Sequence, residues 1–279
     1  LHPLINELVK TDLKPSSESC PEVFENIEKK KVRIISAGIS AEEFLAGFAL
    51  LKARNIPVCV HLINGLPGET EEYIVLTAHY DSTSLSTGAY DNMSGSIGIL
   101  AMAEHFMTEP HKRGIRMILC GSEERGLLGS KAWVRDFPEL AEKCVLNVNL
   151  DMIGSIMGKF HACVTGEEKL VSYIEYFANE MGFGIGVRQG VYSSDSSPMA
   201  DVGIPAVSFA RLAANNTGTI HNSYDTLKLM KAEHMASDIA FIQAFTDRMA
   251  NAVRIPVKRE MPDNMKEKLD IYLCRKRKK

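Results

Sequence analysis

Residues 73–79 read Tyr-Ile-Val-Leu-Thr-Ala-His, an apolar run that ends in a histidine. Six residues of this kind predict a buried strand, and His79 would follow directly at its carboxyl end. From residue 73 onward, similar apolar runs alternate with amphipathic segments. Such an alternation predicts an α/β fold with a largely parallel sheet that is covered by helices on both faces.

The alternation predicts four strands and four helices. The predicted strands cover residues 73–78, 114–121, 145–151 and 204–210, and the predicted helices cover residues 94–107, 129–137, 167–181 and 231–253. In a sheet of this kind, ligands bind outside the carboxyl ends of the strands. Residues that follow these strands are therefore the candidates for chemistry.

The length of 279 residues suits one catalytic domain, which we expect to span residues 1–279. Its first 70 residues are poorly readable and could form an accessory segment. Within them, residues 41–54 predict a helix, and residues 56–62 form a short apolar run. No motif for chemistry is found in this part.

Composition excludes several classes of protein. A net charge of -3 shows no basic excess, so we expect no nucleic-acid partner. No apolar run is long enough for a membrane span, and residues 1–14 lack a signal-peptide pattern, so we expect no membrane association and a cytoplasmic location. The six cysteines include no CxxC pair and are expected to be reduced thiols. The basic residues 275–279 are interpreted as a solvated tail.

Potential metal ligands follow three of the predicted strands. His79 follows the first strand, Glu123 and Glu124 follow the second, and Asp151 closes the third. Two further candidates lie in loops: Asp91 in the glycine-rich turn before a helix, and His221 after a glycine. Imidazole nitrogen and carboxylate oxygen are ligands that Zn²⁺ accepts.

Each candidate also has an ordinary structural interpretation. Asp91 could cap the following helix, Glu123 and Glu124 could begin a solvated helix, and Asp151 could form a turn. The remaining histidines are interpreted as surface or core residues. The joint pattern is far less expected by chance than any single match.

The motifs resemble those of the two-zinc exopeptidases, peptidase family M28. That family includes bacterial leucyl aminopeptidases, glutamate carboxypeptidase II and the glutaminyl cyclases. The matching blocks occur in the family's order, at residues 79–82, 88–95, 121–130, 149–154, 194–195, 203–206 and 221–226. The resemblance covers about residues 73–230 and implies a three-layer α/β/α sandwich with a mixed, mostly parallel central sheet.

The resemblance also implies a ligand set for two zinc ions per chain. Asp91 would bridge the two ions, His79 and Asp151 would complete the first site, and Glu124 and His221 would complete the second. A bridging carboxylate fits metals about 3.5–4 Å apart.

By the same resemblance, Glu123 is the general base that activates a metal-bound water and later protonates the departing amine. Asp81 would accept a hydrogen bond from the His79 imidazole and fix its tautomer. Tyr192 belongs to a loop that resembles the substrate side of the family's site. The implied activity is that of a metallo-aminopeptidase, which hydrolyses the N-terminal bond of a peptide substrate.

Three alternatives remain open at this point. A carboxypeptidase or dipeptidase would need a cation for the substrate carboxylate, and Arg211 and Arg188 are the candidates. A glutaminyl-cyclase-like acyltransferase would use a single zinc ion. A non-catalytic relative would have lost its metals. The sequence does not predict an oligomeric state.

Overall fold

A computed structural model describes residues 60–63, 70–213 and 218–276 of the chain. The helix expected at residues 41–54 lies outside these residues, as does most of the expected accessory segment, so both stay predictions. The chain divides into two compact units, Leu1–Val60 and His61–Lys279. Within the described part of the chain, no helix is both long enough and apolar enough to cross a membrane.

The strands and helices follow one another in mostly alternating order. The strands are β1 (Val60–Ile63), β2 (Thr70–His79), β3 (Arg113–Cys120), β4 (Cys144–Leu150), β5 (Lys159–Thr165), β6 (Gly186–Gln189) and β7 (Ala206–Leu212). The helices are α4 (Ser94–Thr108), α5 (Leu128–Asp136), α6 (Pro138–Lys143), α7 (Glu168–Glu180), α8 (Ser196–Asp201), α9 (Ala232–Asn251) and α10 (Asp263–Tyr272). The described residues also include two short turns of helix, η1 (Ala89–Met93) and η2 (Leu227–Leu229).

The strands form one mixed sheet in the order β1-β3-β2-β4-β7-β5-β6. Strand β2 is parallel to both β3 and β4, and β4 is parallel to β7. Strand β5 runs antiparallel to β7, and β6 runs parallel to β5. The prediction of an α/β fold with a mixed, mostly parallel sheet is confirmed, and every strand and helix predicted from residue 73 onward is present.

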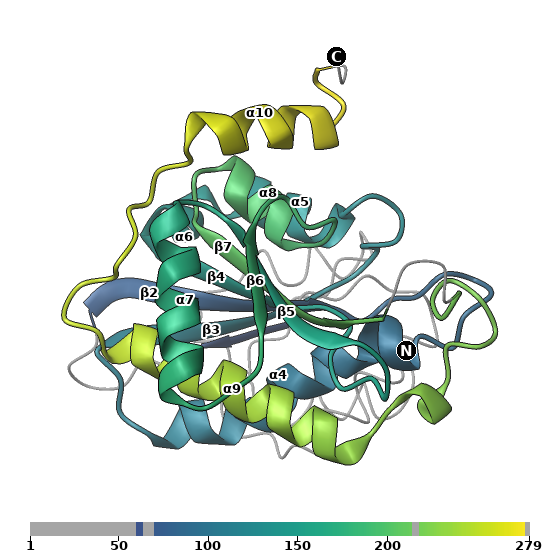
Figure 1. Cartoon of the computed structure of the whole chain (residues 1–279). Helices are drawn as coiled ribbons and strands as arrows, with labels where there is room; N and C mark the ends of the chain where they lie inside the picture. The colour runs from purple at the N-terminus through teal and green to yellow at the C-terminus, as the bar shows by residue number, and fades with distance from the viewer. Residues whose placement is uncertain (1–59, 64–69, 214–217, 277–279) are drawn as a thin grey trace, which may run out of the picture. The chain divides into compact units, whose positions relative to one another are not determined.

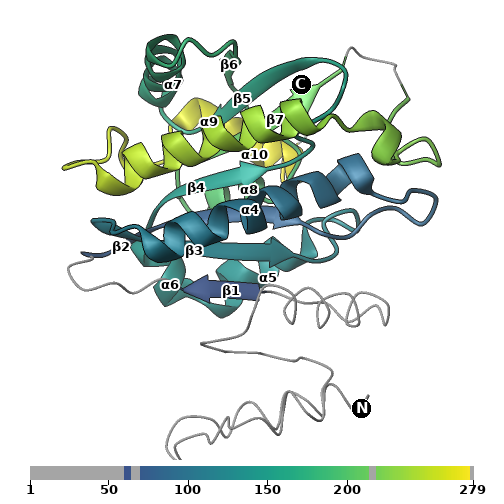
Figure 2. The ribbon, with the colours of Figure 1, turned by 90° about the horizontal axis from the view of Figure 1, so that it is seen from below.

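Helices cover both faces of the sheet (Figure 1). Helices α4 and α9 lie below it in this view and α5 and α8 above, and Figure 2 shows α4 and α9 crossing the lower face. Alternate residues of each strand point to opposite faces. On β2, Tyr73 and Val75 therefore pack with Trp133 of α5 and Met199 of α8.

Phenylalanine side chains fill the contact between the sheet and α9. Phe209 of β7 packs against Phe241 and Phe245 of α9, and Phe160 of β5 stacks on Phe209 with 5.8 Å between ring centroids. These rings are fully buried. Burial of large apolar side chains, at roughly 2–3 kcal/mol each, fixes α9 on the sheet.

The sequence prediction missed β5, β6, α6, α8 and α10. Strand β5 contains Lys159 and His161, which interrupt its apolar run, and β6 has only four residues. Helices α6 and α8 have six residues each, which is too short for a helical period to be recognised.

A buried ion pair joins β7 to α9. The guanidinium of Arg211 donates two hydrogen bonds to the carboxylate of Asp238, from Nε at 2.9 Å and from a terminal nitrogen at 2.5 Å. Asp238 is fully buried and also accepts the backbone N–H of Gly154 at 2.9 Å. Removing one partner of such a pair leaves an uncompensated buried charge.

We expect Asp238→Ala to lower the free energy of unfolding by about 3–5 kcal/mol, because Arg211 would then stay buried without its counter-ion. Urea unfolding at pH 7 measures the change. Glu180→Ala is the matched control, because it removes the exposed ion pair between Glu180 of α7 and Arg248 of α9. We expect that control to change stability little. Equal effects of the two variants would contradict the importance assigned to the buried pair.

Candidate active site

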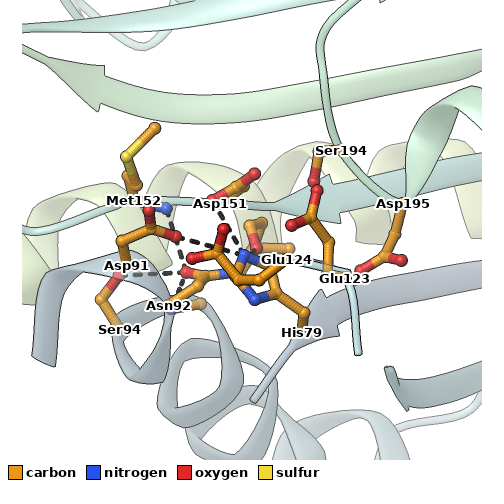
Figure 3. Close-up of polar contacts among 12 residues, drawn as sticks. His79, Asp91, Asn92, Ser94, Glu123, Glu124, Asp151, Met152, Ser194 and Asp195 are labelled. Atoms are coloured by element: carbon orange, nitrogen blue, oxygen red, sulfur yellow. Dashed lines mark hydrogen bonds and ion pairs between the residues drawn. The ribbon is translucent and has the colours of Figure 1, made fainter. Parts of the chain in front are cut away.

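Three parallel strands end side by side, and each end carries a candidate ligand. His79 is the last residue of β2 and pairs with Cys120 at the end of β3. Glu123 and Glu124 follow β3, and Asp151 follows β4 on the other side of β2. The carboxyl ends of parallel strands meet at one edge of a sheet. Figure 3 shows these side chains gathered there.

Asp91 reaches the same place from the turn between β2 and α4. Its φ and ψ of -113° and 91° are not helical, and the Asp91–Asn92 peptide bond is cis. The N-cap of α4 is Met93, so Asp91 does not act as the helix cap that its sequence position allows. Its carboxylate is 5% exposed and faces the strand ends (Figure 3).

Asp91 presents one carboxylate oxygen to each of two histidines. Its Oδ1 lies 3.3 Å from Nε2 of His79, and its Oδ2 lies 3.1 Å from Nε2 of His221. On the first side, Asp151 Oδ1 lies 3.6 Å from His79 Nε2, and on the second side Glu124 Oε2 lies 3.1 Å from His221 Nε2. Asp91 is therefore shared by two groups of three potential ligands.

These distances fit cation sites. In a tetrahedral Zn²⁺ site with ligand bonds of about 2.0–2.1 Å, neighbouring ligand atoms lie about 3.3 Å apart. Glu124 Oε1 and Asp151 Oδ1 are buried and accept no hydrogen bond from the described residues. Buried carboxylate oxygens without a partner are costly, so the donor set itself calls for positive charge.

A third group, His105, His111 and Asp247, has the same residue types but a different geometry. Asp247 Oδ2 lies 2.6 Å from His105 Nε2, and Oδ1 lies 3.1 Å from His111 Nε2. The shorter distance is that of a hydrogen bond and well below a tetrahedral edge. This cluster joins α4 and the turn before β3 to α9. The sequence analysis interpreted both histidines as surface or core residues and did not predict that Asp247 contacts them.

Asp81 connects the end of β2 to the residues after β3. Its carboxylate accepts the backbone N–H groups of Glu123 at 2.9 Å and Glu124 at 3.2 Å. His79 Nδ1 lies 3.1 Å from the backbone oxygen of Asp81 and 3.6 Å from its carboxylate. Although burial acts to raise the pKa of Asp81, its bonds to His79 and Glu123 hold that pKa below the usual range. The Asp81 carboxylate thus orients the backbone of both glutamates, whereas the backbone oxygen of Asp81 is the atom within hydrogen-bond distance of the imidazole. The predicted hydrogen bond from His79 to the Asp81 carboxylate stays a prediction.

The His79 imidazole is 1% exposed, and carboxylates surround it. Burial acts to lower its pKa, but interactions with Asp151, Asp81 and Asp91 raise the pKa well above the ordinary value. The negative charge of the cluster therefore stabilises a cation at this position.

Glu123 lies beside the cluster and belongs to neither group of ligands. Its pKa is raised to about 9, chiefly by burial; His79 opposes the rise, and the charges of Asp151 and Asp195 add to it. Cations among the neighbouring carboxylates would act in the opposite direction. Ser122 before it has a left-handed φ of 58°, which directs the backbone N–H groups of the two glutamates to Asp81.

Two residues that the sequence analysis did not single out hold Asp91 in place. The buried Asp225 accepts the backbone N–H of Tyr90 at 2.7 Å and of Asp91 at 3.1 Å. Asn92 donates to the backbone oxygen of Leu150 at 2.9 Å and accepts the N–H of Met152 at 3.0 Å. Asp225 lies in the block 221–226, so that motif was the available signal for it.

A glycine allows α4 to approach the end of β4. A Cβ added to Gly95 would lie 2.2 Å from the backbone oxygen of Leu150 and 2.7 Å from Oδ1 of Asn92. No other residue fits without moving the backbone. Gly95 therefore keeps the turn that carries Asp91 close to Asp151.

Asp195 and Tyr192 come from the loop between β6 and α8. Asp195 accepts a hydrogen bond from Ser130 at 2.6 Å, and burial raises its pKa to about 6 although His79 and Ser130 oppose the shift. The Tyr192 hydroxyl is buried and has no hydrogen-bond partner among the described residues. Burial, followed by the charges of Asp151 and Asp91, raises the pKa of Tyr192 well above its ordinary value.

The two arginines that were candidates for holding a substrate carboxylate are not part of the cluster around Asp91. Arg211 is bound by Asp238 through two hydrogen bonds and is 13% exposed. Arg188 lies on the edge strand β6, opposite Cys163 of β5. Neither joins the two groups of ligands that share Asp91.

The chain is similar to known aminopeptidases. It is 35% identical over 145 residues to aminopeptidase YwaD of Bacillus subtilis strain 168, covering 50% of this chain and 32% of that protein. It is 38% identical over 139 residues to leucine aminopeptidase 2 of Trichophyton rubrum, covering 45% of this chain and 28% of that protein. The chain thus spans about a third of the length of these relatives.

Solved structures agree with this similarity. The zinc aminopeptidase BSAP of Bacillus subtilis superposes with a TM-score of 0.63 at 26% identity, over 72% of this chain and 53% of that one. The sequence pattern described as Peptidase family M28 matches residues 61–244, well over half of the chain. The chain therefore belongs to peptidase family M28.

Proposed function

We propose that the chain is an aminopeptidase that binds two zinc ions and hydrolyses the N-terminal bond of peptides. One observation carries the proposal: the carboxylate of Asp91 presents separate oxygens to His79 and His221, at 3.3 and 3.1 Å. The names of the similar proteins, which are aminopeptidases, support the substrate class.

The ligand assignment follows the two groups that share Asp91. His79 and Asp151 would hold one zinc ion, Glu124 and His221 would hold the other, and Asp91 would bridge them. Bound there, zinc supplies polarisation of the scissile carbonyl and lowers the pKa of the attacking water to about 7.

Glu123 is the proposed proton carrier of the reaction. Its side chain lies beside the ligands without belonging to either group, so its carboxylate oxygen is available to accept a proton from the attacking water. The same oxygen then donates that proton to the nitrogen of the departing amine. Asp81 holds the Glu123 backbone through the bond of 2.9 Å and thereby keeps the carboxylate in place.

Tyr192 is the proposed hydrogen-bond donor for the substrate. Its buried hydroxyl lacks a partner among the residues that the structure describes, and burial together with the charges of Asp151 and Asp91 raises its pKa, so the hydroxyl keeps its proton. A donor of this kind can bind the carbonyl oxygen as negative charge develops on it.

Each alternative activity has a feature against it. Arg211, a candidate for holding a substrate carboxylate, is already paired with Asp238, which disfavours a carboxypeptidase or dipeptidase. A cyclase with one zinc ion would not use both groups around Asp91, and zinc stoichiometry tests that point.

The cytoplasmic location stays a prediction, which subcellular fractionation tests.

We expect Glu123→Gln to keep about two zinc ions and to lose activity on leucine p-nitroanilide by about 10²–10⁴-fold, because the amide cannot accept the proton. Metal content by mass spectrometry and initial rates, measured on the same samples, check this. Glu142→Gln, an exposed change on α6, is the control and should leave both values unchanged. A zinc-loaded wild type without hydrolysis would refute the aminopeptidase, and an active Glu123→Gln would refute the role of Glu123.

Removal of zinc should destabilise the folded chain. With free zinc at a thousand times its dissociation constant, each bound ion contributes about 4 kcal/mol to the free energy of unfolding. Asp91→Asn should reduce the bound zinc below two and shrink the zinc-dependent gain in stability, because the bridge is lost. Asp247→Asn, which changes the third histidine cluster, should keep two ions. Thermal melting with chelator and with added zinc measures the effect, and equal stability under both conditions would contradict it.

A further inference from the structure

Helix α10 lies beyond residues 61–244, the part of the chain that matches the family pattern. It packs over α8, as Figure 1 shows. Met265 and Leu269 of α10 are buried with Ala200 of α8 and Ala206 of β7. This helix is therefore an integral part of the described fold.

Two arginines hold the segment at both ends. Arg259, before α10, donates to the backbone oxygens of Cys144 at 3.2 Å and Ala141 at 3.0 Å. Arg275, after α10, donates to Asp201 at 3.0 Å. With both ends held, the last turn of the helix has a defined place relative to the end of α8.

That last turn brings Tyr272 to the loop of the active site. The Tyr272 hydroxyl and the Ser193 hydroxyl lie 2.7 Å apart. Ser193 follows Tyr192 in the loop that leads to Asp195. Ser194 and Asp195 follow Ser193 directly in the chain, and Figure 3 shows both beside Glu123. The contact with Ser193 therefore places the Tyr272 hydroxyl at the loop that borders the Glu123 side of the cluster.

The position of Glu123 defines which part of a substrate lies there. A residue that donates a proton to the departing amine must come within about 2.6–3.2 Å of that nitrogen. The residue that follows the cleaved bond carries this nitrogen, so its side chain must lie near Glu123 and the Ser193 loop. Tyr272 is half-buried and its hydroxyl contacts Ser193, so its ring adjoins this loop and is the nearest aromatic surface that α10 can offer to that side chain.

We propose that Tyr272 is a specificity-determining residue, and that it selects apolar and aromatic side chains at the position after the cleaved bond. This inference rests on the proposed aminopeptidase activity. Because Tyr272 lies outside the two groups of ligands, its effect should fall on selectivity for the second residue and leave selectivity for the first residue unchanged.

The test compares dipeptides with the zinc-loaded enzyme. Values of kcat/KM for Leu-Phe and Leu-Gly report on the second residue, and values for Leu-Gly and Ala-Gly report on the first. We expect Tyr272→Ala to lower the ratio of kcat/KM for Leu-Phe to that for Leu-Gly about tenfold. The reason is that the contact between the Tyr272 ring and the phenylalanine ring of the substrate is lost, together with the apolar area that it buries. The Leu-Gly to Ala-Gly ratio should stay within about twofold of the wild type.

Three variants complete the experiment. Tyr272→Phe keeps the ring and should keep the wild-type ratio, and Ser193→Ala removes only the hydroxyl contact and should shift it less than Tyr272→Ala does. Tyr176→Ala is the matched control, because Tyr176 is 77% exposed on α7. Thermal melting confirms that each variant is folded and carries its zinc.

The outcomes separate the two proposals. An active wild type whose Tyr272→Ala variant loses activity equally on all three dipeptides, or loses none, overturns the role of Tyr272 and leaves the aminopeptidase intact. A zinc-loaded wild type that cleaves none of the dipeptides overturns both.

Discussion

The site depends on one buried carboxylate, that of Asp91, which faces a histidine on either side. A carboxylate that is 5% exposed and lies near Asp151 and Glu124 is unfavourable unless positive charge is close. The fold therefore has to fix Asp91 firmly and leave both its oxygens free. It does so through the backbone: Asp225 accepts the N–H of Asp91, and Asn92 joins the turn to the end of β4.

The strand-end candidates were predictable because one rule places them all. Strands β2, β3 and β4 are neighbours and parallel, so His79, Glu124 and Asp151 meet once the apolar runs before them are recognised. Asp91 and His221 lie in loops, where no periodicity places a side chain. Their residue types made them candidates, whereas their assignment to two metal sites came from the resemblance to the family, and the distances around Asp91 are consistent with that assignment.

The contacts of the supporting residues could not be predicted from the sequence for a physical reason, even where a motif contained the residue. Asp225 acts on Tyr90 and Asp91 across more than a hundred residues, and the His105–Asp247 contact spans a similar separation. Such hydrogen bonds leave no periodic trace. Asp81 shows a further difficulty, because one residue can have two sets of partners. Its place two residues after His79 suggested the contact with the imidazole, but nothing in the sequence indicated that its carboxylate binds the backbone of Glu123 and Glu124.

All the proposed ligands lie between His79 and His221, whereas α10 and Tyr272 follow later in the chain. On the proposed roles, bond cleavage and substrate choice are encoded by separate stretches of the gene. Substitutions in the stretch that encodes α10 would then change which peptides are preferred while the proposed ligands and Glu123 stay unchanged.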